Sequence, residues 1–277
     1  MFHPIHQSTA SRRGFTLVEL LVVIVILAIL SSMVLMALAN TQASAREART
    51  RSTITKLDAL ISAKWETYQT RRVPLKPSGT NRTNIARLRT DALREIMRME
   101  LPDQHIDIST AQTASLLPAR PAVSAAYLKR YNNASAKTDA WEGAECLYLI
   151  VAYGLNDPDA LSQFNEAEIG DFDQDGLPEF LDGWGQPISF IRWAPEFVSP
   201  IHNKDTANNH DPFDPMKQDP TAYALYPLIF SAGPDKVLGI KNNRTATNIN
   251  KPYSDNVGNS LSDESLDNIN NHELLAN

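Results

Sequence analysis

The residues whose types and spacing most clearly indicate a chemical role are the acidic ones between Gly170 and Asp182. Counted from Asp171, acidic side chains stand at positions 1, 3, 5, 9 and 12 and a glycine at position 6: Asp171, Asp173, Asp175, Glu179, Asp182 and Gly176. This is the spacing of a calcium loop, because alternate side chains of a tight turn converge on one hard cation. Gly183, Gly185 and Pro187 exclude the exit helix of an EF-hand. The sequence predicts an isolated Ca²⁺ loop, with a solvated acidic turn as the alternative.

Other patterns that could support catalysis or metal binding are weak. The sequence contains no Gly-x-Ser-x-Gly, His-Glu-x-x-His or phosphate-binding loop, so we expect no enzyme activity. Carboxylates at 171–182 could in principle cleave glycosides, a weaker alternative. Cys146 is the single cysteine; it excludes an intrachain disulfide, and its apolar surroundings predict a core position. Residues 199–221 include two histidines, but no spacing places them on one helix face, so we expect a flexible surface loop there.

The element that dominates the chain lies at its start. Residues 15–39 are almost all apolar and contain one charge, Glu19, with Arg12 and Arg13 just before. About twenty apolar helical residues span a bilayer, so this stretch predicts a transmembrane helix. The two arginines place the leader in the cytoplasm and the rest of the chain outside it. A carboxylate inside a membrane is costly and needs a partner.

The segment Gly14-Phe15-Thr16-Leu17-Val18-Glu19-Leu20 resembles the prepilin motif of type IV pilins and type II secretion pseudopilins. The resemblance implies that a prepilin peptidase cuts after Gly14 and that the new terminus, Phe15, is methylated. Met1–Gly14 is then a leader and Glu19 the fifth residue of the mature chain. In a stack of subunits, the Glu19 carboxylate would neutralise the amino terminus of Phe15 in a neighbour and so set the axial register.

The rest of the chain predicts the elements that follow. Apolar residues at 54, 57, 61, 65 and 68 continue one helix face, so a single helix should run from about Phe15 to about Thr70. A second helix is expected over about 84–100, with its arginines mostly solvated: Arg87, Arg89, Arg94 and Arg98. Residues 101–139 predict an irregular region with a short helix near 122–131. Residues 141–153 predict a buried helix or strand, the helix being favoured, and strands are expected at about 188–193 and 223–231.

Three C-terminal stretches resemble those of major pseudopilins. Asp182-Gly183-Trp184-Gly185-Gln186-Pro187 resembles the Asp-x-Trp-Gly-x-Pro segment that leads into their small sheet. Ser231-Ala232-Gly233-Pro234-Asp235 and Leu266-Asp267-Asn268-Ile269 resemble two pieces that close a calcium site in that family. The resemblance implies Asp235 and Asp267 as ligands, with Asn268 and the carbonyl of Leu238 as weaker candidates. Asn268 stands where the family has Asp, and Lys236 where it often has Gly.

Charge is distributed unevenly along the chain. Residues 1–100 contain 15 Lys and Arg against 7 Asp and Glu, and residues 101–277 contain 11 against 25. An acidic distal part argues against nucleic acid as a partner and is compatible with bound cations. We expect five segments: a leader (1–14), a transmembrane helix (15–39), its amphipathic continuation (40–70), a variable insertion (71–140) and a pseudopilin-like region (141–277).

Together these patterns predict an α+β, pilin-like fold: a long N-terminal helix packed on a small antiparallel sheet with long loops. The expected function is that of a structural subunit of a type II secretion or type IV pilus-like filament, anchored once in the inner membrane with its domain in the periplasm. Expected partners are prepilin peptidase, other pilin or pseudopilin subunits and the inner-membrane assembly platform, with secreted cargo as a further possibility. The alternative is a calcium-dependent adhesion or cargo-recognition module on a pilin stem.

Overall fold

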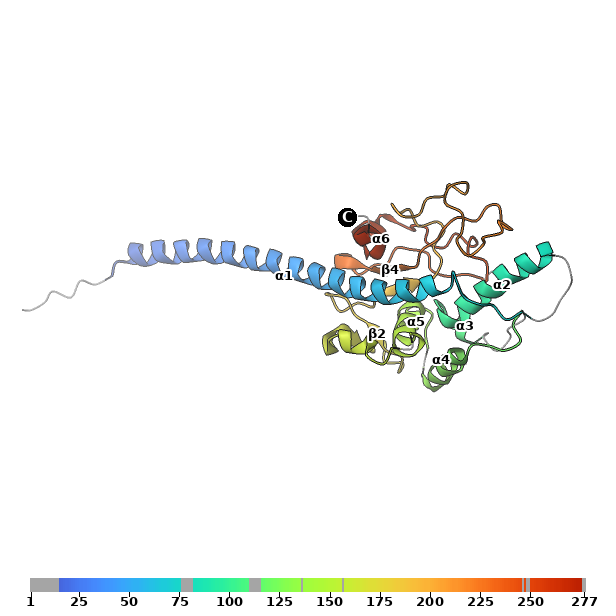
Figure 1. Cartoon of the computed structure of the whole chain (residues 1–277). Helices are drawn as coiled ribbons and strands as arrows, with labels where there is room; N and C mark the ends of the chain where they lie inside the picture. Colours follow the sequence, from blue (N-terminus) through green and yellow to red (C-terminus); the bar gives the residue numbers. More distant parts are fainter. Residues whose placement is uncertain are drawn as a thin grey trace, which may run out of the picture. The chain divides into compact units, whose positions relative to one another are not determined.

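The computed structural model describes residues 15–75, 82–109, 116–135, 137–155, 157–245, 247 and 250–275, without the side chains of 82–84. The chain divides into two units, residues 1–45 and 46–277. The α-helices are α1 (Leu17–Thr67), α2 (Arg82–Glu100), α3 (His105–Ser109), α4 (Ala122–Asn133), α5 (Glu142–Leu149) and α6 (Asn271–Leu275) (Figure 1). A π-helical turn, Ile150–Gly154, extends α5. The predicted helices over about 15–70, 84–100 and 122–131 are therefore confirmed, as is the helix favoured for 141–153.

The strands are short and form two antiparallel sheets. β1 (Ile169–Gly170) pairs with β2 (Glu179–Phe180), and β3 (Ser189–Ile191), β4 (Leu228–Ser231) and β5 (Ile269–Asn270) form a sheet in the order β3-β4-β5. Phe190 lies opposite Ile229, and Phe230 opposite Asn270. With long irregular connections between them, these strands confirm the α+β prediction. The 3₁₀ turns are Ala160–Gln163, Glu166–Glu168, Gly233–Asp235 and Asp263–Asp267.

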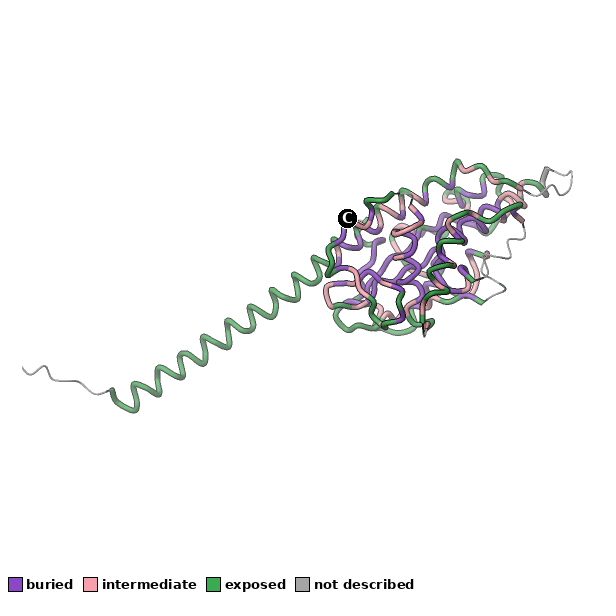
Figure 2. The backbone as a smooth tube through the Cα atoms, turned by 90° about the horizontal axis from the view of Figure 1, so that it is seen from below, coloured by how far each residue is buried: buried purple, intermediate pink, exposed green. Residues whose placement is uncertain are grey.

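The core of the second unit forms around one face of α1. Ile54, Leu57, Ile61 and Trp65, at helical spacing, are at most 4% exposed. They belong to a cluster that also takes in residues of α2, α5, β3 and β4, while α5 packs on β2 and β3. Figure 2 shows the contrast along the helix, since every described residue from Phe15 to Arg49 is exposed and burial begins at Thr50.

Polar contacts fix the second half of α1 within its unit. The Gly183 amide donates to the Thr50 hydroxyl over 2.8 Å, and a Cβ at position 183 would lie 2.2 Å from the Arg46 carbonyl oxygen, so only glycine fits there. Near the chain end, the Asn271 amide donates to the Asp58 carboxylate over 2.6 Å. These contacts connect α1 to segments more than a hundred residues away in sequence.

Two sequence expectations in this unit need correction. Residues 199–221 contain no helix or strand, yet they are not simply a solvated loop, because Phe213 and Asp214 are at most 5% exposed. The region 101–139, expected to be mostly irregular with one short helix, also contains α3 and two buried acids, Asp103 and Asp107. Cys146 is fully buried beside Tyr127 and Leu149, which confirms its predicted core position.

Candidate functional site

The first residues of α1 form a hydrogen-bonded helix cap. Both the amide and the hydroxyl of Thr16 donate to the Glu19 carboxylate, over 2.9 and 3.0 Å, and the Glu19 amide donates to the Thr16 hydroxyl over 3.2 Å. This is a capping box, which satisfies amide groups that have no partner inside the helix. Its sequence signal is a threonine followed three residues later by a glutamate, Thr16-Leu17-Val18-Glu19, which sequence reasoning missed. Within the subunit, Glu19 therefore has a local partner of its own.

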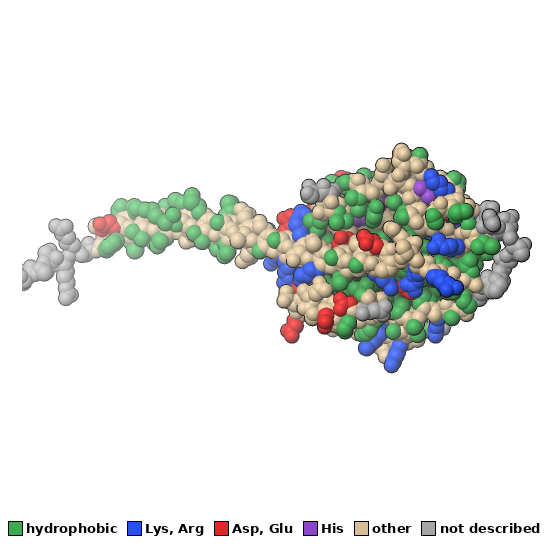
Figure 3. All heavy atoms as spheres, viewed as in Figure 1, with side chains coloured by type: hydrophobic (Ala, Val, Ile, Leu, Met, Phe, Trp, Pro, Cys, Tyr) green, Lys and Arg blue, Asp and Glu red, His purple; other side chains and the backbone are tan. Residues whose placement is uncertain are grey.

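The helix that follows the cap is apolar on all sides. Phe15 is 76% exposed and Leu17 81% exposed, and large apolar side chains remain about half exposed as far as Leu38. They cover this part of α1 in Figure 3. Among the described residues, α1 is long and apolar enough to cross a membrane by length and composition. An apolar surface of this extent is typical of a membrane-embedded or subunit-contacting helix. Gly14, the predicted processing residue, lies outside the described residues.

In the acidic segment 170–182, two of the predicted ligands are used by the backbone. The Asp171 carboxylate accepts the amides of Asp175 and Gly176, over 3.1 and 3.0 Å. One oxygen of Asp182 accepts the amides of Trp184 and Gln186, and the other accepts the Ser231 hydroxyl over 2.6 Å. Asp171 thus shapes its own loop, whereas Asp182 joins the next turn to β4.

The other three predicted ligands gather beside an acid from α5. Oxygens of Glu145, Asp173 and Asp175 all lie within 4.8 Å of one another. Glu179, the first residue of β2, adds a fourth carboxylate, which is buried and close enough to be influenced by the charges of Glu145 and Asp173. Each of the four has one buried oxygen without a hydrogen-bond partner: Oε1 of Glu145, Oδ1 of Asp173, Oδ2 of Asp175 and Oε1 of Glu179. We call these four residues the acidic cluster. Sequence reasoning missed Glu145, which lies 28 residues before Asp173.

The electrostatics of the acidic cluster follow from burial and mutual repulsion. Burial, together with the charges of Glu145, Asp173 and Asp171, raises the pKa of Glu179 to about 8. Burial and the neighbouring charges of Asp175 and Asp173 also raise the pKa of Glu145. Among the described residues, no Lys or Arg forms an ion pair with a member of the cluster. The group therefore carries negative charge that the chain does not neutralise with a strong base.

His105 connects the acidic cluster to a second group of acids. Its Nε2 lies 2.6 Å from Oε2 of Glu145, and its backbone amide donates to Glu142 over 2.9 Å. His105, Asp139 and Glu142 also place ligand atoms within 4.8 Å of one another, but Asp139 is 95% exposed. Burial opposes the charged form of His105, yet the hydrogen bond and charge of Glu145 prevail and raise the pKa of its imidazole.

The C-terminal residues of the second predicted calcium site do come together. The Asp235 amide faces Oδ2 of Asp267 over 3.4 Å, and the Asn268 amide donates to the Leu238 carbonyl over 2.7 Å. Oδ1 of Asn268 is buried without a partner, while Asp235 and Asp267 are exposed. The backbone of Asp235 thus meets the side chain of Asp267, while the Asp235 carboxylate accepts the Val237 amide over 2.8 Å. The Leu238 carbonyl accepts the Asn268 amide, which occupies one of its two lone pairs.

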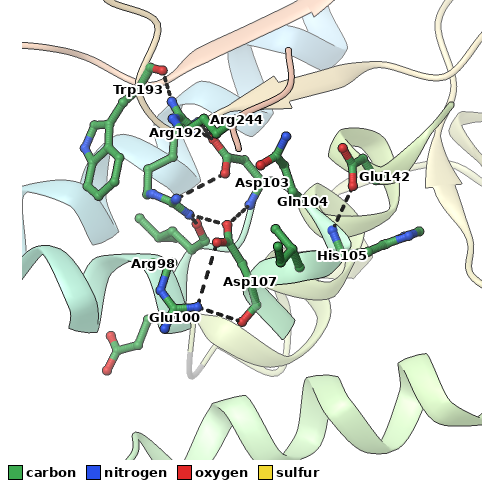
Figure 4. A network of polar contacts seen from close by, with 12 residues as sticks. Arg98, Glu100, Asp103, Gln104, His105, Asp107, Glu142, Arg192, Trp193 and Arg244 are labelled. Atoms are coloured by element: carbon green, nitrogen blue, oxygen red, sulfur yellow. Dashed lines mark hydrogen bonds and ion pairs between the residues drawn. The ribbon is translucent and has the colours of Figure 1, made fainter. Parts of the chain in front are cut away.

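Behind His105 lies a buried ion network, drawn in Figure 4. Arg192 contacts Asp103 over 3.1 Å and Asp107 over 2.9 Å, Arg244 contacts Asp103 over 2.6 Å, and Arg98 donates to the Asp107 carbonyl over 3.3 Å. The side chains of these five residues are at most 2% exposed. Burial opposes the charge of Asp103, but Arg192 and Arg244 lower its pKa to about 2. We call these residues the arginine network.

The prediction that the arginines of α2 are mostly solvated is wrong for two of the four. Arg98 belongs to the arginine network, and Arg94 forms an ion pair with Asp211 over 3.2 Å while its side chain is 9% exposed. The physical reason is that acids from outside α2, Asp107 of the following helix α3 and Asp211 of a distant loop, neutralise them inside the domain. Arg87 remains exposed, as expected.

Comparison with known sequences gives one match. The family described as Prokaryotic N-terminal methylation motif matches residues 9–35. No curated protein and no solved structure matches the chain. The match covers the predicted processing point, the capped start of α1 and most of its exposed apolar part. The chain therefore contains a prokaryotic N-terminal methylation motif that continues into a long apolar helix, which is consistent with a type IV pilin-like protein.

Proposed function

We propose that this protein is a pseudopilin-type structural subunit of a type II secretion or type IV pilus-like filament. It is processed after Gly14 by prepilin peptidase and held in the inner membrane by α1, with its second unit in the periplasm. It then assembles with other subunits on an inner-membrane platform. The observation that carries the proposal is the methylation motif over residues 9–35 on a helix whose apolar side chains are exposed in the single subunit.

The capping box gives Glu19 two roles that an experiment can separate. Within one subunit, Glu19 caps α1 through Thr16. In a filament, its charge would pair with the amino terminus of Phe15 in a neighbour. Glutamine also serves in a capping box, so Glu19→Gln keeps the cap and removes the charge. Thr16→Ala removes the capping hydroxyl and keeps the charge.

The test measures the filament fraction sheared from cells that express each full-length variant. If charge pairing directs assembly, Glu19→Gln and Glu19→Leu should abolish filaments while Thr16→Ala assembles. All variants should be inserted in the membrane and processed, which the mass of the mature chain checks. Filament formation by Glu19→Gln at the wild-type level would contradict charge pairing.

Processing can be tested separately. Gly14→Glu should leave the leader attached and the chain in the membrane fraction, because the peptidase recognises the small residue before its cut. A mature chain beginning at Phe15 in this variant would contradict the assigned processing point. Glu19→Leu serves as the matched control, since it should be processed but not assembled.

We propose in addition that the C-terminal loops bind calcium through Asp235, Asp267 and Asn268. Support comes from the approach of the two loops and from the buried, unpaired Oδ1 of Asn268. A divalent ion there would order the chain end, which no disulfide constrains. In the presence of calcium, protease should cleave residues 233–239 faster in Asp235→Asn than in the wild-type chain.

The alternative, an adhesion or cargo-recognition module, depended on exposed aromatic side chains near 190–230. Of the aromatic residues in that range, five are at most 7% exposed: Phe190, Trp193, Phe213, Tyr223 and Phe230. Phe197 is half-buried and Tyr226 is 42% exposed. Most of these side chains therefore build the core rather than a contact surface. The structural subunit therefore remains the proposed function.

A further inference from the structure

We propose that the acidic cluster, Glu145, Asp173, Asp175 and Glu179, binds a calcium ion. These residues come from three separate places: α5, the 171–178 loop and the start of β2. Ligand oxygens of three of them already lie within 4.8 Å of one another. The proposed site differs from a regular calcium loop, because Glu145 replaces the last position of the loop and Asp171 and Asp182 are bonded elsewhere.

The unpaired oxygens carry this inference independently of the acidic composition. Glu145 and Glu179 are 0% exposed and Asp175 is 2% exposed. In each, one carboxylate oxygen has a firm partner: His105 for Glu145, the Phe172 amide for Glu179 and the Leu177 amide for Asp175. The second oxygen of each is buried with no partner. Buried carboxylate oxygens are normally paired, and a cation is the partner that would satisfy them together.

The donor set selects the kind of cation. The cluster offers only carboxylate oxygens and no thiolate, and Nε2 of the neighbouring His105 is already bonded to Glu145, so the cluster suits a hard cation rather than zinc or copper. Calcium accepts irregular geometry and six to eight oxygens, whereas magnesium requires a near-regular octahedron at about 2.1 Å. Carboxylates that meet from a helix, a loop and a strand match the more tolerant ion.

His105 would act as the outer partner of this site. Its ring nitrogen holds Oε2 of Glu145, which fixes the carboxylate so that Oε1 remains available to the ion. The bound ion would then join α5 to the 171–179 loop. This link lies within the second unit and does not involve α1. The proposed calcium site can therefore be tested independently of filament assembly.

A terbium probe can place the ion. The ring of Trp141 lies 5.3 Å from that of Phe172, inside the loop, so Trp141 is positioned to sensitise terbium bound at the acidic cluster. Trp184 instead lines a cavity with Asp267, beside the C-terminal loops. In the detergent-solubilised full chain, Trp141→Phe should remove most of the calcium-competed terbium emission, and Trp184→Phe should retain it. The reverse pattern would overturn the assignment.

A matched pair of variants tests the ligands. Asp235→Asn weakens the C-terminal site and serves as background, and Glu145→Gln is added to it as the change under test. At about 1 mM calcium, the range of extracellular modules, the background variant should melt at a higher temperature than in chelator. Magnesium at the same concentration should raise its melting temperature less. The double variant should lose this response, with calcium affinity reduced at least about tenfold.

The controls make each result decisive. Without calcium, the double variant should melt no lower than the background variant, because Glu145→Gln removes the repulsion from Asp173 and Asp175 and keeps an oxygen acceptor for His105. A calcium response of equal size in both variants, or none in the background variant, would overturn the proposal. An equal response to magnesium would overturn the choice of calcium.

Discussion

Asp103 and Glu145 are equally buried carboxylates, but their surroundings differ. Asp103 belongs to the arginine network, where Arg192 and Arg244 hold both of its oxygens within 3.1 Å. Glu145 belongs to the acidic cluster, where its neighbours are Asp173 and Asp175 and its one cationic contact is His105. The first region balances its charge with residues of the chain. The second leaves negative charge for which an ion from solution is the natural partner.

The comparison shows why burial of charge alone does not identify a site. Desolvation penalises both regions, and opposite charges at close range offset that penalty in one of them. In the arginine network, Arg192 and Arg244 lower the pKa of Asp103 to about 2, while burial raises the pKa of its neighbour Asp107 to about 6. In the acidic cluster, burial raises the pKa of Glu179 to about 8. The two regions are therefore distinguished by the arginines that lie beside the acids, not by the direction of a pKa shift.

The largest expected effect is the removal of one acid from the arginine network. Asp103→Ala leaves Arg192 and Arg244 buried without their shared partner and should lower the free energy of unfolding by about 3–5 kcal/mol. Urea unfolding of the detergent-solubilised chain, followed by tryptophan fluorescence, measures it. Glu47→Ala is the matched control, because Glu47 forms an exposed ion pair with Arg51 that contributes less than about 1 kcal/mol. An equal loss of unfolding free energy in Asp103→Ala and Glu47→Ala would contradict the larger contribution of the buried arginine network.

Acid should remove the contribution of Asp103 to the free energy of unfolding, which is a smaller effect; burial raises the pKa of its neighbour Asp107 to about 6, so the expected loss concerns Asp103 alone. The pKa of Asp103 is about 2 in the folded chain against 3.8 without the fold, so its contribution is present above pH 3.8 and is lost as pH falls toward 2. Each pKa unit corresponds to about 1.4 kcal/mol, which gives a loss of roughly 2 kcal/mol. The measurement is the stability difference between wild type and Asp103→Asn at several pH values. A difference that stays constant down to pH 2 would contradict this linkage.

The smallest change in the free energy of unfolding is expected in the acidic cluster, where removing an acid should stabilise the chain and not destabilise it. In chelator, Asp173→Asn should leave stability unchanged or raise it by less than about 1 kcal/mol, because it removes repulsion and its Oδ2 contact with Thr138 can persist. Thermal unfolding with and without chelator measures it. A loss of several kcal/mol without calcium would mean that Asp173 is already neutralised within the chain, as Asp103 is.

The sequence predicted elements that depend on local pattern and missed contacts that depend on distant segments. Helix α1, its buried face from Ile54 to Trp65 and the core position of Cys146 follow from periodicity and apolar content. The burial of Arg98 does not, since its partner Asp107 reaches it only after the chain turns into α3. Periodicity describes one helix face but gives no information about which acid will pack against it.

The same limit explains what was found and missed at the candidate site. The spacing of 171–182 indicated a loop rich in possible ligands, and the loop is there. Glu145 was assigned only to the acidic start of α5, although α5 packs on β2 and so meets the loop. Whether Glu145 or Asp182 completes the group depends on this packing. The calcium predictions for both loops remain predictions.

The contacts between α1 and the chain end have a mechanical consequence. Tension applied along the second half of α1 is resisted at the bond from the Gly183 amide to the Thr50 hydroxyl, beside the close approach of Gly183 to the Arg46 backbone, and at the Asn271–Asp58 bond near the C-terminus. Both bonds lie on the same helix, and the segments they attach are far apart in sequence. A force on this helix is therefore shared between the middle and the end of the chain.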